Sequence, residues 1–255
     1  MFDFRNYFYA LLCLLSTSAI CKTYTVLSYE GANPPYSYFE QGQIKGIFPD
    51  VFARIGEITG HEFKFIAVSV GRAQKLFDQG LVDIEPGINP IWRQHNKVKG
   101  VYSTEYMFSR EVILARNAQT IRQAEDLYGK IVGVVRGYKY GNFERHFAAD
   151  RLVKVENLSE SLLLAQLHHG RIDYVLIGDV TAYYFIKQNP QYQKFHAIYQ
   201  VSKLPVSMRM QPKLKQLHTD INLALDTMIK NDEFNTIYNR YIYSPISKPF
   251  VDTLQ

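Results

Sequence analysis

A glutamate, an asparagine and an arginine follow a short apolar run in the first third of the chain. Glu85, Asn89 and Arg93 come after residues 81–84, which are predicted to form a short buried strand. Open parallel sheets bind ligands beyond the ends of their strands, and a guanidinium there can hold a carboxylate through two parallel hydrogen bonds. An arginine on a surface loop explains the same residues equally well. The pattern therefore predicts a carboxylate site at Arg93 without establishing it.

Three further places carry polar groups suited to binding. Residues 136–139, which include Tyr138 and Lys139, follow a predicted strand and are predicted to open a helix whose free N–H groups can bind an anion. Asp179 follows a buried aliphatic run and can accept a hydrogen bond from an ammonium group, although such a residue is more often a helix cap. Tyr36, next to two prolines, is predicted to form the wall of a cleft.

Known catalytic and cofactor patterns are absent from the sequence. It contains no Gly-x-Ser-x-Gly, no His-Glu-x-x-His, no phosphate-binding glycine loop and no calcium loop. The neighbours His168 and His169 would point about 100° apart on a helix, so they are poorly placed to share one metal ion. We therefore predict no cofactor and no metal, and the motifs give no positive sign of catalysis.

Composition and charge narrow the class of protein. The chain has 255 residues, of which 47% are apolar and 21% charged, as in ordinary globular proteins. Its net charge of +5 is modest and its basic residues are scattered, which argues against nucleic-acid binding.

The N-terminus has the pattern of an export signal. Arg5 precedes the apolar residues 7–15, and the small residues Ala19 and Cys21 suit the sites that a signal peptidase requires. We predict a signal peptide over residues 1–21 with cleavage after Cys21; a buried N-terminal helix is the alternative. Ile20 argues against a lipoprotein, which needs a small residue before its cysteine. Both cysteines of the chain would leave with the signal.

Predicted strands alternate with predicted helices, which indicates βαβ units around parallel sheets. Residues 80–83 and 170–173 share the order glycine, any residue, aliphatic residue, aspartate, each after a predicted helix and before a buried strand. This suggests a duplicated lobe, although four residues can recur by chance. The predicted strands are 24–29, 61–68, 81–84, 130–135, 172–177 and 206–210, and the predicted helices are 49–60, 71–79, 123–128, 159–169, 214–229 and 234–241.

Taken together, the motifs resemble bacterial extracellular solute-binding protein family 3, over about residues 24–243. The motifs that carry the resemblance are Asn33-Pro34-Pro35-Tyr36-Ser37-Tyr38, Gly46-Ile47-Phe48-Pro49-Asp50, Gly80-x-Val82-Asp83, Pro90-Ile91-Trp92-Arg93, Tyr102-Ser103-Thr104-Glu105-Tyr106, residues 125–134 and Gly170-Arg171-Ile172-Asp173. Each motif is weak, but their order and spacing together are specific.

The resemblance implies an α/β fold of two Rossmann-like lobes joined by two hinge strands, the clamshell of periplasmic binding proteins of type II. The hinge strands are expected near 109–115 and 200–207. Lobe 1 then comprises 22–110 plus 206–255, and lobe 2 comprises 111–205.

The resemblance also implies a ligand site. Arg93 matches the arginine that clamps the ligand carboxylate in the family, whereas Gly178 stands where the family has the acid for the ligand amine, with Asp179 one residue away. Tyr138 and Lys139 replace the small hydroxyl residues of the second carboxylate site. The predicted ligand-binding residues are Glu30, Tyr36, Glu85, Asn89, Arg93, Tyr138, Lys139 and Asp179.

In function, the resemblance implies a monomeric periplasmic protein that captures a small carboxylate-bearing, amino-acid-like solute. It would deliver this ligand to the membrane permease of an ABC-type importer. Two alternatives stay open: a ligand-sensing module for a signalling partner, and a periplasmic enzyme derived from the same fold, with Glu85 as the carboxylate to test.

Overall fold

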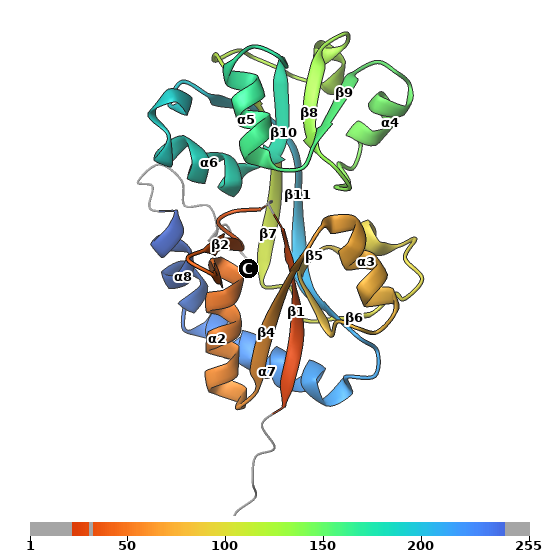
Figure 1. The fold of residues 1–255 in the computed structure, drawn as a ribbon, viewed down its shortest axis with the longest axis vertical. Helices are drawn as coiled ribbons and strands as arrows, with labels where there is room; N and C mark the ends of the chain where they lie inside the picture. The colour runs from red at the N-terminus through yellow and green to blue at the C-terminus, as the bar shows by residue number, and fades with distance from the viewer. Residues whose placement is uncertain (1–21, 31–32, 243–255) are drawn as a thin grey trace, which may run out of the picture.

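The molecule has two halves, one above the other along its long axis (Figure 1). This computed structural model describes residues 22–30 and 33–242. The predicted signal peptide and its cleavage after Cys21 lie outside the described residues. Two long strands, β7 (Met107–Ala115) and β11 (His196–Met210), run between the halves.

The first half is an α/β unit built on parallel strands, as the alternating sequence pattern predicts. Strand β1 (Thr23–Tyr29) pairs in parallel with β4 (Glu62–Val68) along its whole length, and β5 (Ile84–Ile88) lies on its other side. The other elements are β2 (Tyr38–Glu40), β3 (Gln43–Lys45), α2 (Ile47–Thr59), α3 (Val70–Asp78), η1 (Pro90–Arg93) and β6 (Val101–Tyr102).

The C-terminal helices return to this first half and complete its core. Helices α7 (Lys215–Lys230) and α8 (Glu233–Tyr241) pack against α2 beneath the sheet. Val51 of α2 and Ile221 and Leu225 of α7 are fully buried there. Burying such side chains contributes about 1.5–3 kcal/mol each, so α7 and α8 are an integral part of the first half.

The second half repeats this architecture. Strand β8 (Ile131–Val135) pairs in parallel with β10 (Tyr174–Gly178) and with β9 (Val153–Asn157), and β10 pairs antiparallel with β7. Its other elements are η2 (Ala124–Leu127), α4 (Phe143–Ala148), α5 (Glu160–His168), α6 (Asp179–Gln188) and η3 (Pro190–Tyr192).

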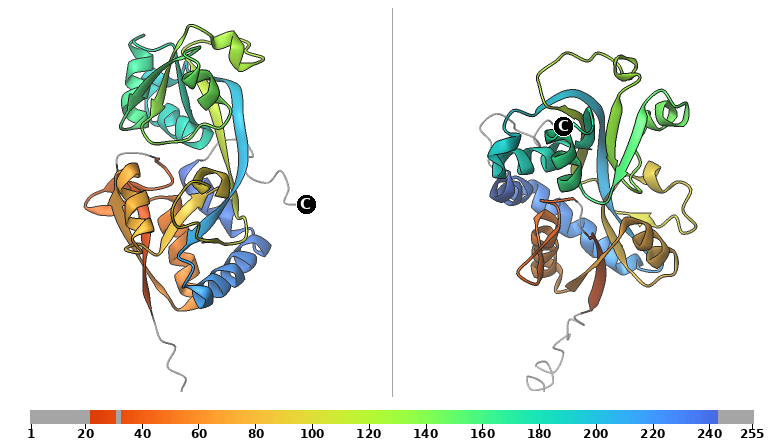
Figure 2. Two further views of the ribbon diagram at one scale, coloured as in Figure 1. Left: turned by 90° about the vertical axis from the view of Figure 1, so that its right-hand side faces the viewer. Right: turned by 45° about the horizontal axis from the view of Figure 1, so that its top comes forward.

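Strands β7 and β11 hold the two halves together. They pair antiparallel from His196 opposite Ala115 to Val206 opposite Met107, and from Ser207 onward β11 pairs with β5 of the first half. Figure 2 shows both strands running side by side along one edge of the molecule. The predicted lobe boundaries after residues 110 and 205 fall inside these strands, and the division of the chain at those residues stays a prediction.

The two glycine–aspartate motifs have the same geometry in both halves. Gly80 and Gly170 have positive φ angles of 71° and 70°, the left-handed conformation that commonly ends a helix. The Asp83 carboxylate accepts from the N–H of Thr25 (2.9 Å), and that of Asp173 accepts from the N–H of Ile131 (2.8 Å). Each aspartate thus ties its segment to the first strand of its own half, which is a structural role.

Three sequence predictions of elements need correction. The strands predicted at 81–84 and 172–177 occur at 84–88 and 174–178, because the aspartates hold the preceding residues in a turn. The helix predicted from Gly137 is wrong: α4 begins only at Phe143. Residues 136–142 form a loop that Tyr140 anchors, since its buried hydroxyl accepts from the N–H of Val135 at 2.8 Å. Across residues 22–30 and 33–242, no helix is long and apolar enough to cross a membrane.

Candidate functional site

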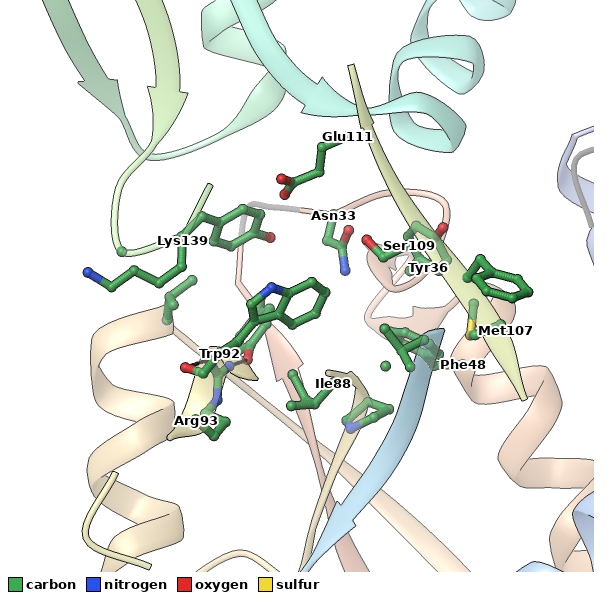
Figure 3. Close-up of a pocket in the computed structure, with 18 residues that line it drawn as sticks. Asn33, Tyr36, Phe48, Ile88, Trp92, Arg93, Met107, Ser109, Glu111 and Lys139 are labelled. Atoms are coloured by element: carbon green, nitrogen blue, oxygen red, sulfur yellow. Dashed lines mark hydrogen bonds between the residues drawn. The ribbon is translucent and has the colours of Figure 1, made fainter. Parts of the chain in front are cut away.

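A pocket lies between the two halves, beside the connecting strands (Figure 3). Its empty space, open solvent included, is about 720 Å³. The lining residues come from the first half, from β7 and β11, and from the loop after β8: Tyr29, Asn33, Tyr36, Phe48, Val70, Pro86, Gly87, Ile88, Trp92, Arg93, Met107, Phe108, Ser109, Glu111, Gly137, Tyr138, Lys139 and Val206. A ligand here would touch both halves at once.

One wall of the pocket is aromatic and apolar. Tyr36 stacks on Phe48 with ring centroids 5.3 Å apart, and Trp92, Ile88 and Met107 line the same space. The predicted place of Tyr36 in a cleft wall agrees with this geometry. Such a wall excludes water from the non-polar part of a ligand.

Below the pocket, the buried Glu85 binds two arginines. Its side chain is fully buried and accepts from Arg93 Nη2 at 2.7 Å, from Arg209 Nη1 at 2.8 Å and from the Tyr29 hydroxyl at 2.5 Å. Burial alone would raise the pKa of Glu85, but the charge and hydrogen bonds of Arg93, the Tyr29 hydroxyl and the charge of Arg209 outweigh it and hold the pKa at about 2. Glu85 does not line the pocket and acts instead as the anion that fixes both guanidinium groups.

Most donors of Arg93 are already used by this cluster. An arginine has five N–H donors. Nε donates to both Glu85 oxygens at 3.2 Å, Nη2 to Glu85 and to Tyr29, and Nη1 to the carbonyl of Trp92 at 3.2 Å. Within the described part of the chain, one Nη1 N–H has no acceptor. Arg93 lines the pocket, but it offers a ligand one donor here rather than two parallel ones.

Tyr138 and Lys139 line the pocket from the loop after β8 rather than from a helix N-terminus. The N–H of Tyr138 already donates to the carbonyl of Val135 at 3.2 Å. The predicted anion site on free helix N–H groups is therefore wrong, because no helix starts at this point. The positive charge of Lys139, whose side chain is exposed at the pocket rim, is what this segment offers an anion.

Three other predicted site residues do not line the pocket. The Asn89 amide donates to the carbonyl of Pro205 at 2.7 Å and accepts from the N–H of Ile91, so it positions η1 and with it Arg93. Asp179 is the first residue of α6, whose N-cap is Gly178; its carboxylate accepts from the N–H of Val180 at 2.6 Å and lies 3.9 Å from Arg110 Nη1, so it is an acid in the first turn of the helix rather than its cap. Glu30 is exposed at the end of β1.

The sequence reasoning missed two carboxylates, Glu111 and Glu160. Glu111 lies on β7 and faces into the pocket, and Glu160 begins α5 and lines a smaller adjoining pocket. Burial raises the pKa of Glu111 to about 8 and that of Glu160 to about 7. The signal for Glu111 was available, because a lone carboxylate interrupts an otherwise largely apolar hinge strand. Glu160 looked like an ordinary first-turn acid.

The site has basic side chains and a carboxyl group on different sides. Arg93 and Lys139 lie on one side of the pocket and Glu111 on another, with Trp92 and Asn33 between them (Figure 3). Among the described residues, no group of three or more His, Cys, Asp or Glu side chains is placed to hold a metal ion. Chemically, the arrangement can bind a small molecule that carries both an anionic and a cationic group.

Comparison with known proteins identifies both the family and the fold. The family "Bacterial extracellular solute-binding proteins, family 3" matches residues 26–244. No curated protein matches the sequence significantly.

Three solved structures illustrate the fold. An ancestral arginine-binding protein bound to arginine has a TM-score of 0.74 and 22% identity, covering 87% of this chain and 98% of that one. A histidine kinase sensor domain with similarity to periplasmic binding proteins has a TM-score of 0.73 and 19% identity, covering 86% of this chain and 96% of that one. The substrate-binding protein of an ABC uptake transporter from Streptococcus pneumoniae, with bound histidine, has a TM-score of 0.71 and 17% identity, covering 89% of this chain and 94% of that one. Likeness at these identities establishes the two-lobed fold.

Proposed function

The chain belongs to the bacterial extracellular solute-binding proteins of family 3, and from this membership we propose that it captures a small amino-acid-like solute that carries a carboxylate. The observation that supports this proposal is the pocket between the halves, with basic side chains on one side, an aromatic wall and an acid on the other. Two structures with bound arginine and bound histidine have the same fold as this chain.

In this proposal the ligand carboxylate lies between Arg93 and Lys139. Arg93 contributes its one uncommitted Nη1 N–H, and Lys139 contributes a mobile point charge from the other half. The non-polar part of the ligand packs on Tyr36 and Trp92. Because the ligand contacts both halves, it stabilises the closed arrangement by its higher affinity for that arrangement.

The proposal also covers the setting of the protein. We place the mature protein in the periplasm after removal of residues 1–21, as a monomer that delivers its ligand to the permease of an ABC importer. A sensory role is the second candidate, since a kinase sensor domain shares the fold. Uptake of the labelled ligand by cells with and without the gene separates the two roles, because only the transport role makes uptake depend on this protein.

The test uses the single tryptophan of the chain, Trp92, which lines the pocket. Its fluorescence is followed while amino acids and small carboxylates are titrated, and the melting temperature is measured in parallel. A ligand at about 100 times its Kd should stabilise the protein by about 2.7 kcal/mol. If no compound of the panel changes either signal, the proposed function is wrong. Incubation with each ligand, followed by mass analysis, detects any turnover and so tests the enzyme alternative.

Variants locate the carboxylate. Arg93→Ala should abolish binding, but it also removes a partner of the buried Glu85 and can unfold the protein. Lys139→Met avoids this difficulty because its side chain is exposed, and we expect it to weaken binding of the carboxylate ligand severalfold. Lys130→Met, an equally exposed lysine of the second half that does not line the pocket, is the matched control and should bind as the parent does.

A further inference from the structure

A smaller pocket extends the first one into the second half. It shares Asn33, Tyr36, Ser109, Glu111 and Tyr138 with the larger pocket and is closed by Glu160 and by residues of β8 and β10. The N–H of Asn33, from the first half, donates to the Glu160 carboxylate at 3.0 Å. The adjoining pocket therefore also lies at the contact between the halves.

Among the described residues, neither carboxylate of this pocket, Glu111 or Glu160, has a cationic partner. Glu160 is 3% exposed and Glu111 is partly buried, and the Glu111 carboxylate accepts from the Ser202 hydroxyl at 3.4 Å. Within residues 22–30 and 33–242, no Lys or Arg lies within ion-pair distance of either acid. Arg110 lines the same pocket but has the Asp179 carboxylate 3.9 Å from its Nη1. A buried carboxylate without a cation is costly for a protein to keep.

A third polar group in the same place also lacks a partner. The Tyr138 hydroxyl is buried, makes no hydrogen bond to any described residue and lies in the field of both Glu160 and Glu111. Buried hydroxyls are normally hydrogen-bonded. One space is thus lined by two acids that lack a counter-charge and by one hydroxyl that lacks a hydrogen bond among the described residues, which fits a cationic hydrogen-bond donor supplied from outside the chain.

We propose that Glu111 and Glu160, with the Tyr138 hydroxyl, form a subsite for a cationic nitrogen at the end of the ligand remote from its carboxylate. This inference rests on the proposed function and names the ligand class: a carboxylate with a terminal ammonium or guanidinium group. Figure 3 shows why the two charges must be apart, since Trp92 and Asn33 lie between Arg93 and Glu111. A cation in this pocket supplies the charge that both acids lack, and it can donate hydrogen bonds to Glu111 of the connecting strand β7 and to Glu160 of the second half.

Protonation supports this assignment. In the free protein, burial favours the protonated form of both acids, whereas a bound cation favours the ionised form. Binding should therefore release protons near neutral pH. The other charged groups that face this region are Arg110 on β7, Glu144 on α4, Asp179 on α6 and Lys139 in the loop after β8.

The test compares ligands of equal shape and different charge on the full chain. L-arginine is paired with L-citrulline and L-lysine with L-norleucine, with affinity read from Trp92 fluorescence and calorimetry. We expect the cationic member of at least one pair to bind about tenfold more tightly or better, which is about 1.4 kcal/mol. Calorimetry in two buffers of different ionisation enthalpy should show proton release for that ligand.

Variants then assign the effect to residues. Glu111→Gln and Glu160→Gln should each reduce the preference for the cationic member about tenfold and reduce proton release. Glu105→Gln removes the same charge from an exposed side chain outside both pockets and should change neither. Because amide replaces acid at unpaired positions, both test variants are expected to fold, and their melting temperatures check this.

The outcomes separate the two proposals. If cationic and neutral members bind equally, or if the glutamine variants keep the full preference and the proton release, the cation subsite is wrong and the proposed function stands. If no amino acid or carboxylate binds at all, the proposed function and this inference fall together.

Discussion

Two groups of acids in this protein lie close to one pocket and have opposite surroundings. Glu85 in the first half is bound by Arg93, Arg209 and Tyr29, and its pKa is held at about 2. Glu111 and Glu160, at the hinge and in the second half, have no cation within ion-pair distance among the described residues, and burial raises their pKa values to about 8 and about 7. The chain supplies counter-charges to the carboxylate in one place and supplies none, among the described residues, in the other.

The difference indicates which acids serve the fold and which are available to a ligand. An acid whose counter-charge comes from the chain itself is a structural element, and removing it leaves buried arginines unpaired. An acid without a counter-charge costs stability in the free protein, so its presence in a pocket favours a role in binding. The predicted site residue Glu85 falls in the first class, and the missed residues Glu111 and Glu160 fall in the second.

The largest expected contrast is in stability. Glu85→Gln should lower the free energy of unfolding by about 3–5 kcal/mol, because Arg93 and Arg209 lose their shared anion while they stay buried. Glu111→Gln should cause no loss of stability at neutral pH, because it removes an acid that has no counter-charge among the described residues. Urea unfolding of both variants beside the parent measures the difference.

Glu40→Gln controls for charge alone, because the pair of Glu40 with Lys45 is exposed and such pairs contribute about 0–1 kcal/mol. If Glu85→Gln cost no more than this control, or if Glu111→Gln cost as much as Glu85→Gln, the distinction between the two groups would be lost.

The second contrast is in the pH dependence of stability of the free protein. The pKa values of Glu111 and Glu160 are raised above the ordinary value of 4.5. Their contribution to the free energy of unfolding is therefore full below about pH 4.5. It is lost as the pH rises to about 7 for Glu160 and to about 8 for Glu111. The lowered pKa of Glu85 acts the other way: its contribution is present above about pH 4.5 and is lost as the pH falls toward about 2. Each group changes the free energy of unfolding by at most about 1.4 kcal/mol per pH unit.

Urea unfolding at a series of pH values measures these slopes. The double variant Glu111→Gln with Glu160→Gln should flatten the decline of the free energy of unfolding between about pH 5 and about pH 8. It should leave the change below about pH 4.5, to which Glu85 contributes, as in the parent. A parent-like decline in the double variant would show that other groups cause it.

The smallest contrast concerns the hydroxyl partners of the two groups. Tyr29→Phe removes the 2.5 Å hydrogen bond to Glu85 and should cost about 1.5–3 kcal/mol, as hydrogen bonds to charged groups do. Ser202→Ala removes a long 3.4 Å contact to Glu111 and should cost less than about 1 kcal/mol. Equal losses, measured by thermal and urea unfolding, would contradict the view that Glu111 lacks strong partners.

Local sequence patterns predicted much of the fold. Glycines that end helices, aspartates that follow them and the alternation of apolar residues lie within a few residues of one another, and such short-range signals are readable from sequence. They placed β1, β4, α3, α5 and α7 to within about two residues, and they identified the matching segments around Asp83 and Asp173. They failed at residues 136–142, where a long-range anchor, Tyr140 in the core, keeps the chain in a loop.

The sequence by itself therefore determined the family, the α/β units and the presence of Arg93, Tyr36 and Lys139 near one pocket. Only the tertiary structure decided what each charge meets. Glu85 and Arg209 are 124 residues apart in the chain, a separation that no local sequence pattern can bridge. Glu160 accepts a hydrogen bond from Asn33, which is 127 residues away. Whether a buried acid is paired or free depends on such distant contacts, because electrostatic energy depends on distance in space and on burial.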